Sequence, residues 1–209
     1  MASSLDAATL FGVNGLVAFV TGAGTGIGTM YAKALAQNGA AKIYIGGRRL
    51  EKLQELAESI GPNVIPIQCD VTSKEDISKA VDVIEKDSGY LNLLVANAGI
   101  NGAHPGMMSP DVTLEEFSER NFALDVDEFT ETFRVNVAGV WFCAMAFLKL
   151  LDKGNKKGNL EQTSQVIVTS SISSYTKRLL SGAAYGQSKA AVNALIKQLA
   201  AALPKWKIR

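Results

Sequence analysis

The chain has 209 residues, and its 47% apolar and 20% charged content is ordinary for a globular protein with a substantial core. Its 21 lysines and arginines balance 20 acidic residues, so no overall field would gather nucleic acid or an anionic membrane. No basic leader precedes the first apolar run, near 16–20, which is too short to cross a bilayer. We therefore expect one domain over 1–209, in the cytoplasm, that binds neither nucleic acid nor membrane.

Apolar segments of strand length alternate along the chain with longer segments of helical period. This alternation predicts an α/β fold, in which parallel strands are joined by crossover helices. The predicted strands are 16–21, 42–46, 64–69, 91–96 and 165–170. Each is evenly apolar, so we expect each to be buried on both faces.

The helical periods are bounded by glycine, proline and capping residues. The predicted helices are 26–38, 50–60, 126–151 and 183–203, with a further helix that begins after TSKED, residues 72–76. In TSKED, Thr72 and Glu75 have the spacing of a capping box. The polar sequence DKGNKKGN, 152–159, predicts a surface loop, and Pro204 is expected to end the last helix.

The two cysteines and the single histidine carry little functional signal. Cys69 and Cys143 lie in apolar surroundings without metal-like spacing, and His104 alone leaves a zinc site short of ligands. We expect both thiols to be buried core groups and expect no metal site. His104 lies in NGAHPG, which predicts a loop, with the alternative that it lines a ligand mouth.

The glycine-rich sequence TGAGTGIG, 21–28, leads from the first predicted strand into a helix. Such a loop lets the backbone approach a pyrophosphate at a helix N-terminus, although a tight turn packed on glycines would look the same. The spacing fits T-G-x-x-x-G-x-G, with Gly22, Gly26 and Gly28, and Ile27 stands where G-x-G-x-x-G needs its third glycine. In this variant the chain resembles the short-chain dehydrogenase/reductase family.

The end of the second strand predicts the choice of nucleotide. It reads YIGGRRLEKL, with Arg48 and Arg49 and no acid before Glu51, whereas the family places an NAD-selecting aspartate near Gly47. An arginine there suits the 2′-phosphate of NADP, so we expect NADP(H) rather than NAD. One of the two arginines is alternatively a solvated charge that opens a helix, and Arg48 is the stronger candidate.

Two further motifs extend the resemblance. In CDVT the family implies contact of Asp70 and Val71 with adenine, and NAG, Asn97 to Gly99, would support the sheet beside the cofactor. Each alone would equally be a polar turn at a strand end. The cofactor-binding residues implied by the resemblance are Gly22, Gly26, Ile27, Gly28, Arg48, Arg49, Asp70, Val71, Asn97, Ala98, Gly99, Tyr185 and Lys189.

YGQSK, 185–189, places Tyr185 and Lys189 on one face of the last predicted helix. A fixed positive charge near a phenol lowers its pKa from about 10, which makes tyrosine usable as a general acid or base. This spacing alone is common in helices. The resemblance implies that Tyr185 transfers the proton, and that Lys189 tunes it and binds the nicotinamide ribose.

Two more residues complete the expected catalytic set. VTSSISS, 168–174, supplies the substrate-orienting serine of the family, and Ser171 fits best, with Ser170 and Ser173 as alternatives. In RVNVAG the resemblance implies that Asn136 holds a water that links the lysine to solvent. A buried amide with satisfied hydrogen bonds is the alternative for Asn136.

The chain departs from the family in two places. The segment 101–130 is longer than usual, and we expect either a short helix at the active-site rim or a surface insertion without ligand contact. Family members continue beyond KWKIR, so the resemblance implies a doubly wound, three-layer Rossmann fold that lacks the last two of seven strands. The strand at 165–170 would then have an unpaired edge.

The resemblance implies an oxidoreductase that interconverts a small-molecule carbonyl and a secondary alcohol with NADP(H). The alternative is a nucleotide-binding but inactive partner or regulatory protein, which would bind NADPH without turnover. Apolar faces on the helices that begin near Val126 and Ala183 are implied to pair in a homodimer or homotetramer.

Overall fold

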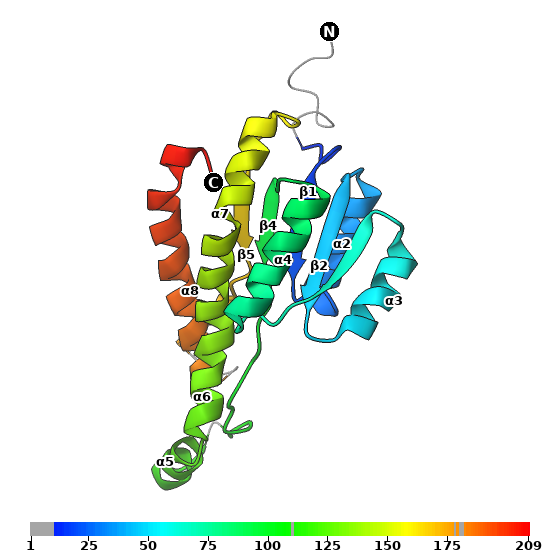
Figure 1. Cartoon of the computed structure of the whole chain (residues 1–209). Helices are drawn as coiled ribbons and strands as arrows, with labels where there is room; N and C mark the ends of the chain where they lie inside the picture. Colours follow the sequence, from blue (N-terminus) through cyan, green and yellow to red (C-terminus); the bar gives the residue numbers. More distant parts are fainter. Residues whose placement is uncertain (1–10, 110, 178, 180–181) are drawn as a thin grey trace.

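The computed structural model describes residues 11–109, 111–177, 179 and 182–209 (Figure 1). Its centre is a five-stranded parallel sheet with strand order β3-β2-β1-β4-β5. The strands are β1 (Val17–Thr21), β2 (Lys42–Gly47), β3 (Val64–Gln68), β4 (Leu93–Ala96) and β5 (Gln165–Val168). The predicted fold class, a doubly wound parallel sheet with helices on both faces, is confirmed.

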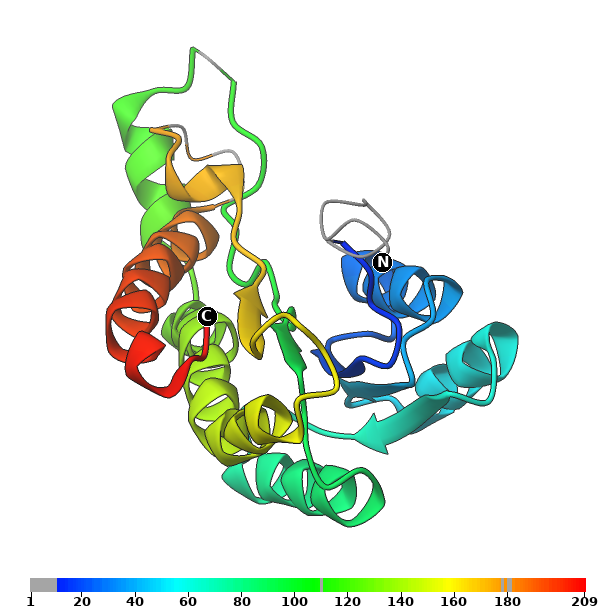
Figure 2. The same ribbon diagram turned by 90° about the horizontal axis from the view of Figure 1, so that it is seen from above.

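Side-chain alternation along the strands divides the core into two layers. Ala18 and Val20 of β1 pack with helices on one face, and Val17 and Phe19 pack with helices on the other. The first face is covered by α2 (Gly26–Gln37) and α3 (Leu50–Ile60), and the second by α4 (Lys74–Asp87), α7 (Val140–Lys157) and α8 (Ala183–Ala202). Figure 2 shows the sheet between these two sets of helices.

Burial of the strands differs from the prediction at the two edges of the sheet. Every residue of β1 and β4 is buried, as expected, whereas β3 and β5 are partly exposed because each has only one neighbouring strand. The outer side of β5 is also paired in part. The N–H of Val166 donates to the carbonyl oxygen of Arg209 at 2.8 Å, and the N–H of Arg209 donates to Ser164 at 3.0 Å.

The longest helix runs without a break through α6 (Val126–Phe133), the π-helical turn η1 (Arg134–Gly139) and α7. The prediction that 152–159 forms a loop was wrong for 152–157, because polar residues there make tertiary contacts. The Asn155 side chain donates to the carbonyl oxygen of Lys207 at 2.9 Å and accepts from the N–H of Ser164 at 2.7 Å. Gly158 then ends the helix in a left-handed conformation, with φ of 63°.

By length and composition alone, residues 126–157 could cross a membrane. Half of the most apolar window in this helix is buried within the fold, so its apolar side chains are used in packing. A core helix of a globular protein meets the same criterion, and this observation therefore weighs little.

Helix α4 begins one residue later than the capping-box prediction. Ser73, not Thr72, is its N-cap, and the Ser73 hydroxyl accepts from the N–H of Asp76 at 3.1 Å. The Thr72 hydroxyl is committed elsewhere, because it donates to Oδ1 of Asp70 at 2.8 Å. The 3-10 turns η2 (Ile172–Ser174) and η3 (Pro204–Trp206) were not predicted, whereas α5 (Leu114–Phe122) lies in the segment 101–130, where a short helix was one of the two expectations.

Candidate active site

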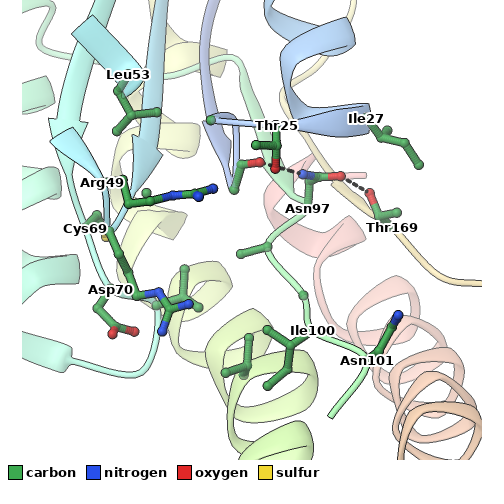
Figure 3. Close-up of a pocket in the computed structure, with 18 of the residues that line it drawn as sticks. Thr25, Ile27, Arg49, Leu53, Cys69, Asp70, Asn97, Ile100, Asn101 and Thr169 are labelled. Carbon is green, nitrogen blue, oxygen red and sulfur yellow. Dashed lines mark hydrogen bonds between the residues drawn. The ribbon is translucent and has the colours of Figure 1, made fainter. Parts of the chain in front are cut away.

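A cleft of about 610 Å³ opens at the carboxyl ends of the strands, where β1 and β4 lie side by side and the chain reverses its direction across the sheet (Figure 3). Open α/β sheets bind ligands at this switch point. The lining residues among those described are Gly22, Gly24, Thr25, Ile27, Gly47, Arg48, Arg49, Leu53, Cys69, Asp70, Val71, Asn97, Ala98, Gly99, Ile100, Asn101, Val135, Thr169, Tyr185 and Lys189. This set contains 11 of the residues predicted from the cofactor motifs and nine that were not predicted.

The glycine loop is shaped by positions that tolerate no side chain. Gly22 has φ of +66°, and a Cβ there would lie 2.7 Å from Cα of Ala98. A Cβ on Gly28 would lie 2.7 Å from Nδ2 of Asn97. Gly26 has φ of +58° and, like Gly28, forms the loop without lining the cleft.

The glycine loop places the first turn of α2 at the cleft, where the N–H groups of that turn can bind a ligand. Thr25 precedes α2 and lines the cleft, and its side chain makes no capping hydrogen bond to any described residue. The first N–H groups of a helix lack intrahelical partners and carry a partial positive charge. An anionic group in this part of the cleft would therefore be stabilised by α2.

Asn97 ties together the ends of three strands beneath the cleft. Its Nδ2 donates to the carbonyl oxygen of Thr21 at 3.0 Å. Its Oδ1 accepts from the hydroxyl of Thr169 at 3.0 Å (Figure 3). The Thr21 hydroxyl oxygen in turn accepts the N–H groups of Asn97 and Ala98, at 3.0 and 3.1 Å. Thr21 and Thr169 were not predicted as site residues. Their position at a strand end directly before a motif residue was the available signal.

Two cations and one carboxylate line the cleft beyond β2 and β3. Figure 3 shows Arg49 pointing into the cleft and Asp70 near its rim. Burial alone would raise the pKa of Asp70, but hydrogen bonds from the N–H and hydroxyl of Thr72, with the charges of Arg48 and Arg134, lower it. Asp70 is therefore an ionised acceptor at neutral pH, held on Oδ1 and next to the arginines.

Tyr185 and Lys189 reach the cleft from consecutive turns of α8. The Lys189 Nζ lies 5.8 Å from the centroid of the Tyr185 ring and donates to the carbonyl oxygen of Thr169 at 2.7 Å. Only 4% of Lys189 is exposed, and this burial lowers the pKa of its ammonium group. The arrangement places a cation beside a phenol in a cleft open to a ligand.

Asn136 lies behind the cleft, in the π-helical turn η1, and is fully buried. Its Oδ1 accepts from the N–H of Ile100 at 2.8 Å. Its Nδ2 donates to the carbonyl oxygen of Ile100 at 2.9 Å and to the hydroxyl of Ser188 at 3.0 Å. A Cβ on Gly99 would lie 3.1 Å from this Oδ1 and 3.6 Å from Nζ of Lys189, so Gly99 separates the two side chains. Both donors of the amide have protein partners.

The three candidate serines follow β5 and differ in their contacts. The Ser170 hydroxyl donates to Oδ1 of Asn193 on α8, at 2.7 Å. The Ser171 hydroxyl caps η2, accepting from the N–H of Ser173 at 3.1 Å, and its own proton can still be donated to a ligand. Thr169, not Ser171, belongs to the described lining of the cleft. The catalytic role of Ser171 stays a prediction.

The segment 101–130, of which residue 110 lies outside the described residues, has two parts. Its beginning packs against the site, since Ala103 is buried and a Cβ on Gly182, before α8, would lie 2.9 Å from the Ala103 carbonyl oxygen. Arg120 holds this part, donating from Nη2 to the carbonyl oxygen of Pro105 at 2.7 Å. Helix α5 buries none of its side chains and lies beyond the end of the sheet (Figure 1). The segment therefore contains a short helix, but this helix lies on the surface, and the part that packs against the site is not helical.

Neither cysteine has reactive character. Cys69 and Cys143 are buried, as predicted. Desolvation raises the pKa of the Cys69 thiol to about 12 and also raises the pKa of Cys143. Among the described residues, no group of three or more His, Cys, Asp and Glu side chains could hold a metal ion.

Comparison with known proteins agrees with the fold. A family model described as short chain dehydrogenase matches residues 16–209. Over 208 residues the chain is 52% identical to "Short-chain dehydrogenase/reductase PhomF" of Diaporthe leptostromiformis, covering 99% of this chain and 71% of that protein. The chain belongs to the short-chain dehydrogenase family of oxidoreductases, and it is shorter than this relative.

Solved structures show the same arrangement. A Pseudomonas aeruginosa RhlG/NADP active-site complex superposes with a TM-score of 0.78 at 25% identity, covering 96% of this chain and 72% of that one. A 3-ketoacyl-(acyl-carrier-protein) reductase from Brucella melitensis complexed with NADH gives a TM-score of 0.77 at 27% identity, with coverage of 94% and 74%. The family to which this chain belongs binds a nicotinamide cofactor, and these two solved relatives carry NADP and NADH respectively.

Proposed function

We propose that the protein is an NADP(H)-dependent oxidoreductase that interconverts a carbonyl and a secondary alcohol, with Tyr185 as general acid and base. The observation that carries this proposal is the buried cation of Lys189 beside the Tyr185 ring, in a cleft whose opposite wall suits a dinucleotide. A small-molecule substrate would bind near Asn101 and Thr169, which line the same cleft as Tyr185.

The walls of the cleft fit the dinucleotide part by part. Gly22 leaves room for a pyrophosphate at the start of α2, where uncapped N–H groups would bind it. Asp70, fixed through Oδ1, would accept a hydrogen bond from the adenine amino group and Val71 would contact its ring. Gly28 and Gly26 keep the loop in this shape, and Ile27, which is 55% exposed, lines the cleft beside it.

The preference for NADP(H) over NAD(H) is supported by charge. Solved relatives carry either cofactor, so the support comes from this chain. Arg48 and Arg49 both line the cleft after β2, at the place where a 2′-phosphate would lie, and Gly47 stands where an NAD-binding member would carry a carboxylate. A phosphate dianion gains two charge-assisted contacts there.

In catalysis the nicotinamide would supply or accept the hydride, and the side chains would manage the proton and the oxygen. Tyr185 would donate its hydroxyl proton to the substrate oxygen during reduction and take it back during oxidation. Lys189 would stabilise the phenolate form and bind the nicotinamide ribose. Ser171 would donate a hydrogen bond to the substrate oxygen. Asn136 would hold Ile100 and Ser188 in place next to Lys189. The family resemblance implies in addition that Asn136 holds a water that links Lys189 to solvent.

The test is the oxidation of NADPH in the presence of a panel of ketones, with the parent protein compared with Tyr185→Phe. This change removes one hydroxyl and keeps the ring. We expect turnover by the parent and a loss of at least about a hundredfold in the variant. Equal turnover by the two proteins would overturn the assignment of Tyr185. NADPH binding without turnover by the parent would instead favour an inactive nucleotide-binding partner.

We also propose a homodimer, formed through an apolar groove of about 750 Å³ between the long helix and α8. Phe133, Trp141 and Phe142 from the long helix face Ala194 and Leu195 from α8 in this groove. Trp141 and Phe142 are each 38% exposed, which is unusual for neighbouring aromatic residues of a monomer. A second copy of the chain would bury the same surface on both partners.

A further inference from the structure

The serine-rich turn after β5 is held by a single side chain of α8, Asn193. Oδ1 of Asn193 accepts from the Ser170 hydroxyl at 2.7 Å. Nδ2 of Asn193 donates to the Ser174 hydroxyl at 2.8 Å, and that hydroxyl donates to the carbonyl oxygen of Ser171 at 2.6 Å. The Asn193 amide therefore binds the turn on both sides of Ser171, at Ser170 and at Ser174. The Ser174 hydroxyl links the amide to the carbonyl oxygen of Ser171.

Asn193 is placed on the helix that carries the other proposed catalytic groups. It follows Lys189 by four residues and Tyr185 by eight, so the three side chains lie along neighbouring parts of one helix face. Lys189 also contacts the same strand end, through the carbonyl oxygen of Thr169. α8 is thus fastened to the chain after β5 at Thr169 by the lysine, and at Ser170 and Ser174 by the asparagine.

The hydrogen bonds that join Asn193, Ser170, Ser174 and the carbonyl oxygen of Ser171 form a polar circuit outside the described lining of the cleft. The side-chain polar groups of Asn193, Ser170 and Ser174 are engaged with one another and with the Ser171 carbonyl oxygen, whereas the Ser171 hydroxyl still has a proton to donate to a ligand. Each polar group in the circuit has a defined donor or acceptor, which restricts the turn to one conformation. The residue whose position is restricted most is Ser171, because its neighbours, its carbonyl oxygen and its Oγ all take part in hydrogen bonds of this turn.

We propose that Asn193 is a positioning residue, which sets the Ser171 hydroxyl at a fixed place relative to Tyr185 and Lys189. The proposal rests on the proposed function, since it assigns the circuit a purpose in the same reaction. A substrate oxygen bound between the serine and the tyrosine hydroxyls requires both at hydrogen-bond distance at once. Displacement of a catalytic group by about 1 Å can cost about a hundredfold in rate.

The test is a double-mutant cycle on carbonyl reduction with NADPH, using Asn193→Ala, Ser171→Ala and the double variant. We expect Asn193→Ala to lower kcat by roughly 10- to 100-fold, with KM for NADPH within about twofold of the parent. In the Ser171→Ala background the same change should alter kcat by less than about twofold, because the group that Asn193 positions is already missing.

The controls separate this proposal from the proposed function. Asn121→Ala, which removes a partly exposed asparagine side chain of α5, should leave kcat unchanged. Ser174→Ala repeats the cycle through the other side of the circuit if Asn193→Ala does not fold. If Asn193→Ala lowers kcat by the same factor in the parent and in the Ser171→Ala background, the positioning role is overturned. The proposed function would still stand in that case, provided that Tyr185→Phe is inactive. Parent-like turnover by Tyr185→Phe would overturn the proposed function and this inference together.

Discussion

The ammonium group of Lys189 lies 5.8 Å from the centroid of the Tyr185 ring, within the range over which a cation interacts with an aromatic face. Its Nζ is also fixed by a 2.7 Å hydrogen bond to the carbonyl oxygen of Thr169. Burial lowers the pKa of Lys189 because the charged amine loses its hydration. Burial of the Lys189 ammonium group beside the tyrosine therefore costs the folded state desolvation free energy.

This cost makes the free energy of unfolding depend on pH. The pKa of Lys189 is lower in the folded chain than in the unfolded chain, where it is about 10.4. Between these two values the unfolded chain binds more protons, so the contribution of Lys189 to stability rises with pH there and is constant above about 10.4. Urea unfolding between about pH 7 and pH 10 should show that Lys189→Met loses this rise.

Lys197→Met is the matched control, because Lys197 is an exposed lysine on the same helix. It should keep the pH dependence of the parent. If the unfolding free energies of the parent and Lys189→Met differ by the same amount at every pH, the lowered pKa of Lys189 is contradicted.

The shape of the glycine loop predicts a second pair of variants. A Cβ on Gly28 would lie 2.7 Å from Nδ2 of Asn97 and would meet the carbonyl oxygen of Gly22, so the loop or the Asn97 network must shift. Gly28→Ala should lower the free energy of unfolding by about 1–3 kcal/mol and weaken NADPH binding. Urea unfolding and a fluorescence titration with NADPH measure the two effects.

Gly24→Ala is the control for that substitution. A Cβ on Gly24 would make an ordinary contact of 3.7 Å with Cδ2 of Leu53, and its effect on stability should stay within about 0.5 kcal/mol. If Gly28→Ala is as stable as Gly24→Ala, the predicted steric clash of a Cβ at position 28 is contradicted.

The features predictable from the sequence were those that depend on local pattern. Evenly apolar strands and the glycine spacing gave the sheet, the switch point and most of the cleft. Asn155 shows where pattern fails: it reads as a loop residue, but tertiary hydrogen bonds to Lys207 and Ser164 keep it helical. Thr169 and Asn193 were missed for the same reason, since their contacts with Lys189 and Ser170 form only when the end of β5 and α8 meet.

Cofactor choice can be tested at the end of β2. Removing both cations in Arg48→Ala/Arg49→Ala should raise KM for NADPH by roughly 100-fold or more, because each of the two charge-assisted hydrogen bonds is worth about 1.5–3 kcal/mol. KM for NADH should change little, since NADH has no 2′-phosphate. Lys52→Ala, an exposed cation on α3, is the control and should leave both constants near those of the parent.

The converse change is Gly47→Asp, which places a carboxylate at the ribose end of the cleft. The site has space for it, because a Cβ on Gly47 would lie 3.7 Å from the Leu53 methyl carbons. We expect kcat/KM to fall for NADPH by repulsion of the phosphate and to rise for NADH through a hydrogen bond to the ribose. If both the Arg48→Ala/Arg49→Ala protein and the Gly47→Asp protein still prefer NADPH, the 2′-phosphate does not bind at the end of β2.

The apolar groove between the long helix and α8 predicts the state of association. Light scattering should give the parent a mass of at least two chains, because a second copy would cover Phe133, Trp141 and Phe142. Trp141→Asp should shift the protein to the mass of one chain, since the new carboxylate would be buried without a partner in the dimer. Val83→Asp is the control: Val83 is an apolar residue of α4 that is 42% exposed and lies outside the groove, and its replacement should leave the mass unchanged. A parent that elutes with the mass of one chain at micromolar concentration would mean that the exposed aromatic residues serve another partner.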